Sequence, residues 1–523
     1  MRVDPVKLEI FKNKFSAVAE EMGVTLNRTA FSPNIKERRD YSCAIFNASG
    51  DMLTQAAHIP VHLGSMPMSV KAAIEEITIN PGDMVILNDP FKGGTHLPDV
   101  TIVAPVFSKK HVENPLFYIA NRAHHADIGG MSAGSMPLSR SIYQEGLIIP
   151  ALKIIKDNTI DQGLLNLILC NVRTPVERQG DFAAQFMANK TGIKRINELI
   201  EKNGYDNTIS YSNALIDYSE RMMRQTLEKI PDGQYEFEDY LDSDGVDDQP
   251  VLIKTSVQMI GDQVTIDFRG SSKQVQGSVN AVYAITASAC LYVFRSLVRE
   301  NIPTNAGCMR PLNIKTESGT IVDANKPAAV AGGNVETSQR IVDCLLGALS
   351  KAIPEKIPAA SQGTMNNLTI GGINTLSGKA FAYYETMGGG TGASALTNGE
   401  NAIQSHMTNT LNTPVEAIEY EYPFRISKYA IRRNSGGNGL HKGGDGLIRE
   451  FTLLNDAECT MLSERRQFSP YGLLEGERGK PGKNLLITKD KTEELLPGKF
   501  NRYLKKGDQL RIETPGGGGY KKP

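Results

Sequence analysis

The sequence predicts a mixed α/β protein of the α+β kind, folded as a single large interlocked body with several mixed and antiparallel sheets. At 523 residues and 57.1 kDa, the chain has the length of about two to four domain-sized regions. No internal repeat, low-complexity tract or long linker divides it. Segments with apolar residues at helical spacing are interspersed with segments in which apolar and polar residues alternate, so helices and half-buried strands should be mixed along the chain.

Composition and charge exclude several classes of function. The chain has 57 Lys and Arg against 58 Asp and Glu, which leaves a formal net charge of −1. No clustered basic field is present, so we expect binding neither to nucleic acid nor to an anionic membrane surface. The N-terminus has no apolar signal core, and no run approaches the roughly 18 apolar residues of a membrane-spanning helix. The sequence therefore predicts a cytoplasmic protein.

The N-terminal segment predicts a helix, a hairpin and a second helix. Asp4 can cap the first helix, and Pro5 suits its first turn. The apolar stripe of this helix consists of Leu8, Phe11, Phe15, Val18 and Met22. Short β-prone runs at 41–47 and 51–56 flank a turn that contains glycine, which is typical of a hairpin. The second helix is expected from about Ser69 to Ile77, because Gly and Pro interrupt the segment before it.

Two later strands, at about 99–107 and 116–125, predict a second hairpin. If the strands pair symmetrically about the middle of their polar connector, Asp99 lies opposite His124. Directly opposed residues have Cβ atoms about 4.5 to 5.5 Å apart, close enough for both side chains to bind one ion. His125 would then point to the other face of the sheet, and a register error of one residue would exchange the two histidines.

The stretch GGTHLPDV, residues 93–100, places a third histidine beside this pair. His96 could fold back from its Gly-Gly-Thr loop toward Asp99 and His124. Two imidazoles and a carboxylate form a nitrogen and oxygen ligand set that suits zinc first, with manganese or iron as alternatives. The other interpretation is that these histidines end strands and hydrogen-bond one another. A Ser-His-Asp triad is disfavoured, because neither Ser132 nor Ser135 is expected at the strand-to-helix elbow in which a nucleophilic serine lies.

The remainder of the chain reads as three regions. The first, 1–200, carries the candidate ligands; 201–375 is a mixed α/β middle region; and 376–523 is rich in glycine and in β-strand residues. The glycine clusters at 386–394 and 433–446 lack the G-K-[ST] ending of a phosphate-binding loop. They therefore indicate close packing or a substrate channel, and the sequence predicts no nucleotide cofactor in this chain.

Several long motifs resemble the hydantoinase B/oxoprolinase family. They are IKERRDYSCAIFNASGDMLTQAAHIPVHLGSMP, NDPFKGGTHLPDV, RAHHADIGG and the terminal ETPGGGGY, so the resemblance runs from near the N-terminus to the last residues. It implies a hydantoinase B-like fold. Related proteins include subunits of N-methylhydantoinases and lactamases, the C-terminal half of 5-oxoprolinases and the α subunits of acetone carboxylases.

The resemblance also implies a ligand set. By similarity, the metal ligands would be Asp40, His96, Asp99 and His124. Spacing alone does not point to Asp40, which could instead pair with a neighbouring arginine of the ERRD segment. Residues expected to orient the ligands or to replace one of them are His125, Asp127, His58 and His62.

The activity that the resemblance implies is ATP-dependent hydrolysis of a cyclic amide, such as a hydantoin, a lactam or an oxoproline-like compound. ATP and Mg²⁺ would bind an A-type partner subunit, and the assembly would be a hetero-oligomer such as (αβ)2. Two alternatives remain at this stage. One is a subunit of an ATP-dependent ketone carboxylase, although acetone carboxylase α subunits are longer than this chain. The other is a scaffold with a structural metal, which would be closed to solvent by four protein ligands.

Overall fold

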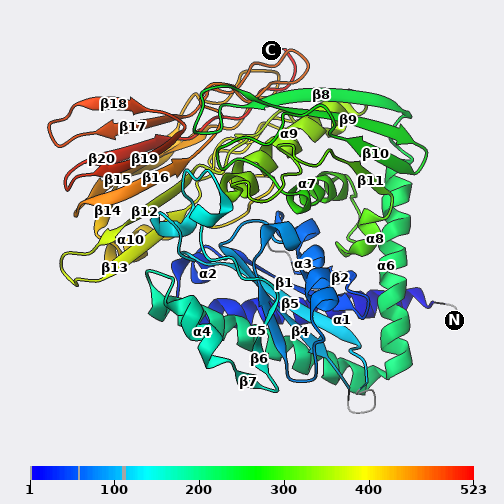
Figure 1. Cartoon of the computed structure of the whole chain (residues 1–523). Coiled ribbons are helices and arrows are strands. Elements are labelled where there is room, and N and C mark those ends of the chain that lie inside the picture. The colour runs from blue at the N-terminus through cyan, green and yellow to red at the C-terminus, as the bar shows by residue number, and fades with distance from the viewer. Residues whose placement is uncertain (1–2, 57–58, 109–112, 523) are drawn as a thin grey trace.

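The computed structural model describes residues 3–56, 59–108 and 113–522. Within them the chain forms four sheets with helices between and around them, so the predicted mixed α/β fold is confirmed (Figure 1). The N-terminal sheet lies at the bottom of Figure 1 and the C-terminal sheets lie at its upper left. No helix in the described ranges is both long enough and apolar enough to cross a membrane.

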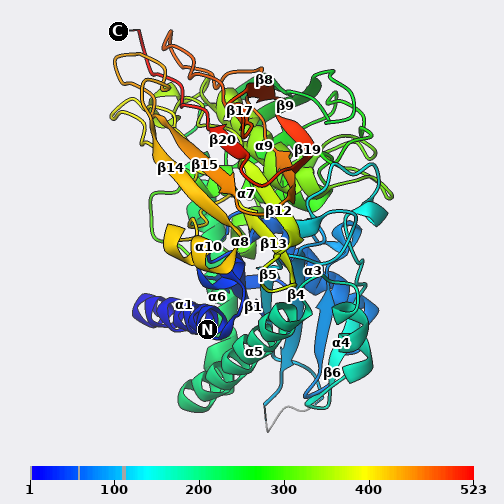
Figure 2. The ribbon, with the colours of Figure 1, turned by 90° about the vertical axis from the view of Figure 1, so that its left-hand side faces the viewer.

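A seven-stranded antiparallel sheet, in the order β2-β1-β5-β4-β3-β6-β7, carries the predicted site. Its strands are β1 Tyr41–Asn47, β2 Met52–Gln55, β3 Met84–Leu87, β4 Asp99–Val106, β5 Phe117–His124, β6 Leu152–Lys156 and β7 Thr159–Ile160. Successive side chains of β1 point to opposite faces of the sheet and enter two different hydrophobic cores. Cys43 and Ile45 enter the core beneath helices α1 (Pro5–Thr29) and α5 (Pro175–Asn203), whereas Ala44 and Phe46 enter the core beneath α3 (His62–Glu76). Figure 2 shows α5 crossing in front of the strands.

The first helix forms as its sequence predicts. The side chain of Asp4 accepts a hydrogen bond from the backbone N–H of Val6, and Pro5 occupies the first turn. The stripe faces the sheet, since Phe11, Phe15 and the later stripe residues are buried.

The predicted start of the second helix is wrong. We expected it near Ser69 with the histidine before it, but α3 begins at His62 and continues through Pro67. Pro67 lies inside the helix, and Gly64 fits against the backbone of α7, where a Cβ would lie 2.7 Å from Ser288 N. Tertiary packing therefore supports helix where local sequence predicted a break, and it places His62 on a rigid element.

The middle and C-terminal regions supply the remaining elements. The helices are α2 Pro33–Lys36, α4 Gln162–Leu169, α6 Tyr205–Leu227, α7 Tyr283–Ser296, α8 Ala306–Met309, α9 Ser338–Leu349 and α10 Val415–Glu421. The short 3-10 turns are η1 Pro90–Lys92, η2 Ala133–Ser135, η3 Ile142–Gln144 and η5 Pro354–Lys356, and η4 Gly333–Thr337 is a π-helical turn. One sheet runs β11-β10-β9-β8 and contains β8 Gly233–Leu241, β9 Val251–Ile260, β10 Gln263–Asp267 and β11 Leu312–Lys315.

The two C-terminal sheets run β13-β12-β16-β19 and β14-β15-β20-β17-β18. Their strands are β12 Asn367–Ile373, β13 Ala380–Glu385, β14 Phe424–Arg432, β15 Gly446–Leu453, β16 Ala457–Leu462, β17 Lys483–Ile487, β18 Glu493–Leu496, β19 Lys499–Leu504 and β20 Gln509–Glu513. Helix α6 joins the layers: its first half packs in the core of the N-terminal sheet, and Met223 and Leu227 pack in the core of the middle sheet (Figure 1). The layers are therefore interlocked.

The glycine-rich segments pack against one another through their backbones. The N–H of Gly390 donates to Pro515 O at 3.0 Å, and the N–H of Gly517 donates to Gly444 O at 2.9 Å. A Cβ at Gly390 would lie 1.9 Å from Gly444 O, and one at Gly517 would lie 1.9 Å from Thr391 O. These N–H groups are thus used by neighbouring segments, so the predicted packing role is confirmed for these glycines.

Candidate metal centre

The pairing of β4 with β5 places two candidate ligands on one face of the sheet. Asp99 lies directly opposite His124, as the symmetric hairpin predicted. Arg122 shares this face, and its guanidinium donates to Ser65 and Ser69 of α3 at 2.6 and 2.7 Å. Because side chains alternate along a strand, Asp99 and His124 also point to the α3 side. The connector residues 109–112, about which the register was predicted, lie outside the described residues.

The second histidine of the pair points to the opposite face. His125 Nε2 lies 3.0 Å from Gln185 Oε1, and its ring stacks on Phe182, so both partners come from α5. Burial lowers the pKa of His125 to about 4 and keeps the ring neutral. Asp127 is also turned elsewhere, because it accepts hydrogen bonds from the backbone and the guanidinium of Arg173 at 2.6 and 2.8 Å. The structure brings neither residue to the candidate ligands.

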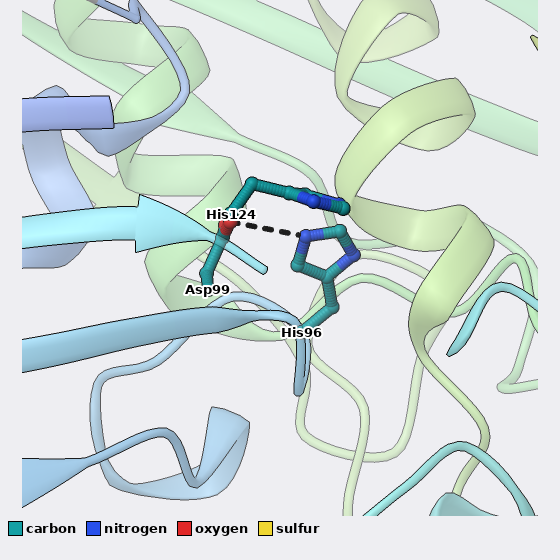
Figure 3. A group of neighbouring side chains, drawn as sticks. All are labelled: His96, Asp99 and His124. Atoms are coloured by element: carbon teal, nitrogen blue, oxygen red, sulfur yellow. Dashed lines mark ion pairs between the residues drawn. The ribbon is translucent and has the colours of Figure 1, made fainter. Parts of the chain in front are cut away.

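His96 completes a group of three (Figure 3). Its Nε2 lies 3.3 Å from Asp99 Oδ1, and one ligand atom from each of His96, Asp99 and His124 lies within 4.8 Å of the others. The two glycines before His96 explain its position. Gly93 has φ +85° and passes so close to α3 that a Cβ would lie 2.4 Å from Met68 C. Only a residue without a side chain fits there, and the tight turn sends His96 back toward the strand ends.

Asp40 reaches the same place from the start of β1. Its carbonyl accepts a hydrogen bond from the N–H of His124 at 3.0 Å. Its carboxylate lines a cavity of about 20 Å³ together with Asp99 and His124, a space large enough for roughly one water molecule or ion. The alternative partner is also present, because Arg38 Nη2 lies 3.8 Å from Asp40 Oδ2. Burial raises the pKa of Asp40 to about 6. The geometry is compatible with a fourth ligand that Arg38 orients.

Three further residues hold the imidazoles, and no motif or spacing singles them out. Asn34 Nδ2 lies 3.1 Å from His124 Nδ1, and the ring of Tyr384 in β13 stacks on His124 at 4.5 Å between centroids. Asn334 Nδ2 lies 3.0 Å from His96 Nε2. Gly332 and Gly333 precede Asn334 in the sequence, and Asn334 lies in the π-helical turn η4. π-Helical turns recur at functional sites.

The protonation states and free atoms of the group fit a metal ion. Burial lowers the pKa of His124 well below its usual range, so this ring is neutral. Burial alone would raise the pKa of Asp99, but the imidazoles of His96 and His62 outweigh it and hold that pKa well below its usual range. Neutral imidazoles and an ionised carboxylate are the forms that bind metal. Within the described ranges, His124 Nε2 and Asp99 Oδ1 make no hydrogen bond.

The remaining candidates are His58 and His62. His58 lies outside the described residues. His62 is buried at the start of α3, and its Nε2 lies 3.2 Å from Asp99 Oδ2. It therefore contacts Asp99 at Oδ2, whereas His96 lies nearest to Oδ1.

Comparison with known proteins places this arrangement in a family. The sequence matches the family model of Hydantoinase B/oxoprolinase over residues 4–523. The chain belongs to the hydantoinase B/oxoprolinase family. Within this family, 5-oxoprolinase 1 of Arabidopsis thaliana is 39% identical over 546 residues, which cover 99% of this chain and 42% of the plant protein. A B-type D-/L-hydantoinase component of Pseudomonas sp. (strain NS671) is 32% identical over 100% of this chain and 90% of its own length.

Two solved structures share the fold. The crystal structure of an ATP-dependent caprolactamase from Pseudomonas jessenii matches with a TM-score of 0.91 and 27% identity, over 100% of this chain and 92% of that chain. The nucleotide-free structure of an acetone carboxylase also has a TM-score of 0.91, over 99% of this chain and 76% of that chain. Its identity is 17%, so this second likeness shows a shared fold alone. The chain is thus a hydantoinase B-type protein related to hydrolases of cyclic amides.

Proposed function

We propose that this chain is the metal-binding subunit of an ATP-dependent hydrolase of cyclic amides, and that it works with an A-type subunit that binds ATP and Mg²⁺. The observation that carries the proposal is the buried group of His96, Asp99 and His124, in which one ligand atom from each residue lies within 4.8 Å of the others. Asp99 and His124 also line a cavity of about 20 Å³. The likeness to an ATP-dependent caprolactamase supports the reaction class. Hydantoins, lactams and oxoproline-like compounds are the substrates proposed.

The proposed ligands are His96, Asp99 and His124, with Asp40 as the fourth. Zinc is the ion that this ligand set fits first, and manganese and iron are the alternatives. When bound, the ion supplies a Lewis acid or a water of lowered pKa. The chain's own residues hold the site in shape: Tyr384 fixes the plane of the His124 ring by stacking, and Asn334 contacts the ring of His96. Burial of the group limits the access of bulk water.

The partner is proposed because an amide resists hydrolysis unless its carbonyl is activated, and the glycine clusters of this chain lack the G-K-[ST] ending of a phosphate-binding loop. Backbone N–H groups in these segments, such as those of Gly390 and Gly517, donate to carbonyls of neighbouring segments. We propose that the A-type subunit phosphorylates the amide oxygen with ATP and that the two subunits form a hetero-oligomer such as (αβ)2.

The purified chain is expected to hydrolyse no ATP alone and to form a stable complex when it is co-expressed with an A-type subunit encoded beside it. The complex should show ATP hydrolysis that depends on added substrate, measured by phosphate release across a panel of hydantoins, lactams and ketones, with and without bicarbonate. Turnover of a cyclic amide supports the proposal. Turnover of a ketone only in the presence of bicarbonate would identify a carboxylase instead, and vigorous ATP hydrolysis by this chain alone would contradict the need for a partner.

A further inference from the structure

We infer that Thr95, His62 and Ser42 are positioning residues that hold Asp99 through its Oδ2 atom and leave Oδ1 as the single oxygen available to an ion. The inference rests on the proposed function, because it concerns the same metal centre. It explains the threonine of the GGTHLPDV stretch, which is buried and is not a candidate ligand.

The two oxygens of Asp99 have different surroundings. Oδ2 lies 2.5 Å from the hydroxyl of Thr95 and 3.2 Å from His62 Nε2. Oδ1 makes no hydrogen bond within the described parts of the chain and faces His96 Nε2 at 3.3 Å. A carboxylate has no proton to give, so the hydroxyl of Thr95 must donate to Oδ2. Two donors on Oδ2 fix the carboxylate plane and orient Oδ1 toward the imidazoles.

The third residue, Ser42, sets the tautomer of His62. Its Oγ lies 2.9 Å from His62 Nδ1. A neutral imidazole carries one proton, and the contact with the carboxylate requires that proton on Nε2. Nδ1 must then accept, so the Ser42 hydroxyl donates to it. The chain of donors therefore runs from Ser42 to His62 to Asp99. Hydrogen-bonding partners behind a metal ligand commonly fix its orientation in this way.

This chain of donors is not a nucleophilic triad. In a hydrolytic triad the serine contacts Nε2 and the carboxylate contacts Nδ1 of the histidine, whereas here the two nitrogens are used the other way round. Ser42 is fully buried in β1, and His62 is 1% exposed, so no substrate carbonyl reaches the hydroxyl without displacing the sheet. The arrangement can orient Asp99, but it cannot present Ser42 to a substrate.

The test is metal affinity of the full-length chain, measured with zinc in competition with a chromophoric chelator. Thr95→Val keeps the shape and removes the donor, and we expect it to weaken zinc binding about 10- to 100-fold. His62→Gln is expected to weaken it over a similar range, and Ser42→Ala less, because the imidazole remains. Thr95→Ser restores the hydroxyl and should return most of the zinc affinity that Thr95→Val loses. With Co²⁺ in place of zinc, Thr95→Val should also change the visible absorption spectrum.

A matched control separates this effect from general disturbance of the core. Thr255 is fully buried in β9, its hydroxyl makes no hydrogen bond within the described residues, and it is not part of the centre. Thr255→Val should leave zinc affinity unchanged. Asp99→Asn, a change at a proposed ligand, should reduce zinc binding more than any positioning variant.

The outcomes separate the two proposals. If the unmodified chain and Asp99→Asn both fail to bind zinc, manganese or iron, the metal centre itself is refuted. If the unmodified chain binds and Asp99→Asn does not, but Thr95→Val and His62→Gln bind as tightly as the unmodified chain, the positioning role is refuted and the metal centre stands. If Thr95→Ser loses as much zinc affinity as Thr95→Val, the positioning role of Thr95 is also refuted, because restoring the hydroxyl would then have no effect.

Discussion

Replacement of His124 by alanine is expected to lower the bound metal from about one ion per chain to nearly none, because it removes one of the four proposed ligands. Activity of the complex with its partner should fall with the metal. Elemental analysis of the purified, folded variant measures the first effect, and circular dichroism confirms the fold. Alanine at His96 or Asp99 should have the same consequence.

His125→Ala is the matched control, and it should produce the opposite pattern. His125 contacts Phe182 and Gln185 on the far face of the sheet, away from the proposed ligands. Its removal leaves a cavity and an unpaired amide oxygen, so unfolding free energy should fall by about 2 to 4 kcal/mol while the metal content stays unchanged. Metal loss in His125→Ala together with retention in His124→Ala would refute the assignment of ligands by strand face.

The second large effect is expected in the glycine-rich packing. Gly390→Ala and Gly517→Ala each introduce a Cβ 1.9 Å from a backbone carbonyl oxygen of another segment, and a backbone moves less readily than a flexible side chain. We expect each change to lower unfolding free energy by about 3 kcal/mol or more, or to prevent recovery of folded protein. Urea unfolding followed by circular dichroism measures the loss.

Gly163→Ala in α4 provides the comparison, because the nearest atom to its Cβ would lie at an ordinary 3.4 Å and the position is exposed. Alanine has a higher helix propensity than glycine. The unfolding free energy of this variant should therefore be unchanged or higher by up to about 1 kcal/mol. Equal stability of Gly390→Ala, Gly517→Ala and Gly163→Ala would show that the segments separate readily and that backbone packing does not hold this region together.

The sequence was sufficient to predict those helices and strands that are determined by residues close to one another along the chain. The cap at Asp4 and the stripe that follows it determined the first helix, because capping and helical periodicity act within a few residues. The pairing of Asp99 with His124 followed from the two strand patterns and a symmetric connection. Alternation then assigned His125 to the other face, since a strand gives successive side chains opposite directions.

Contacts between distant segments were decided only by the tertiary structure. Nothing local indicates that α3 begins at His62 and brings it to Asp99, since Gly64, which argues against helix, fits against the backbone of α7. Tyr384 and Asn334 meet the imidazoles from distant parts of the chain, and no periodicity encodes such a contact. The sequence by itself determined which strand faces carry ligands, because side-chain direction is a local property. The tertiary structure decided which residues surround them, because that depends on how separate layers pack.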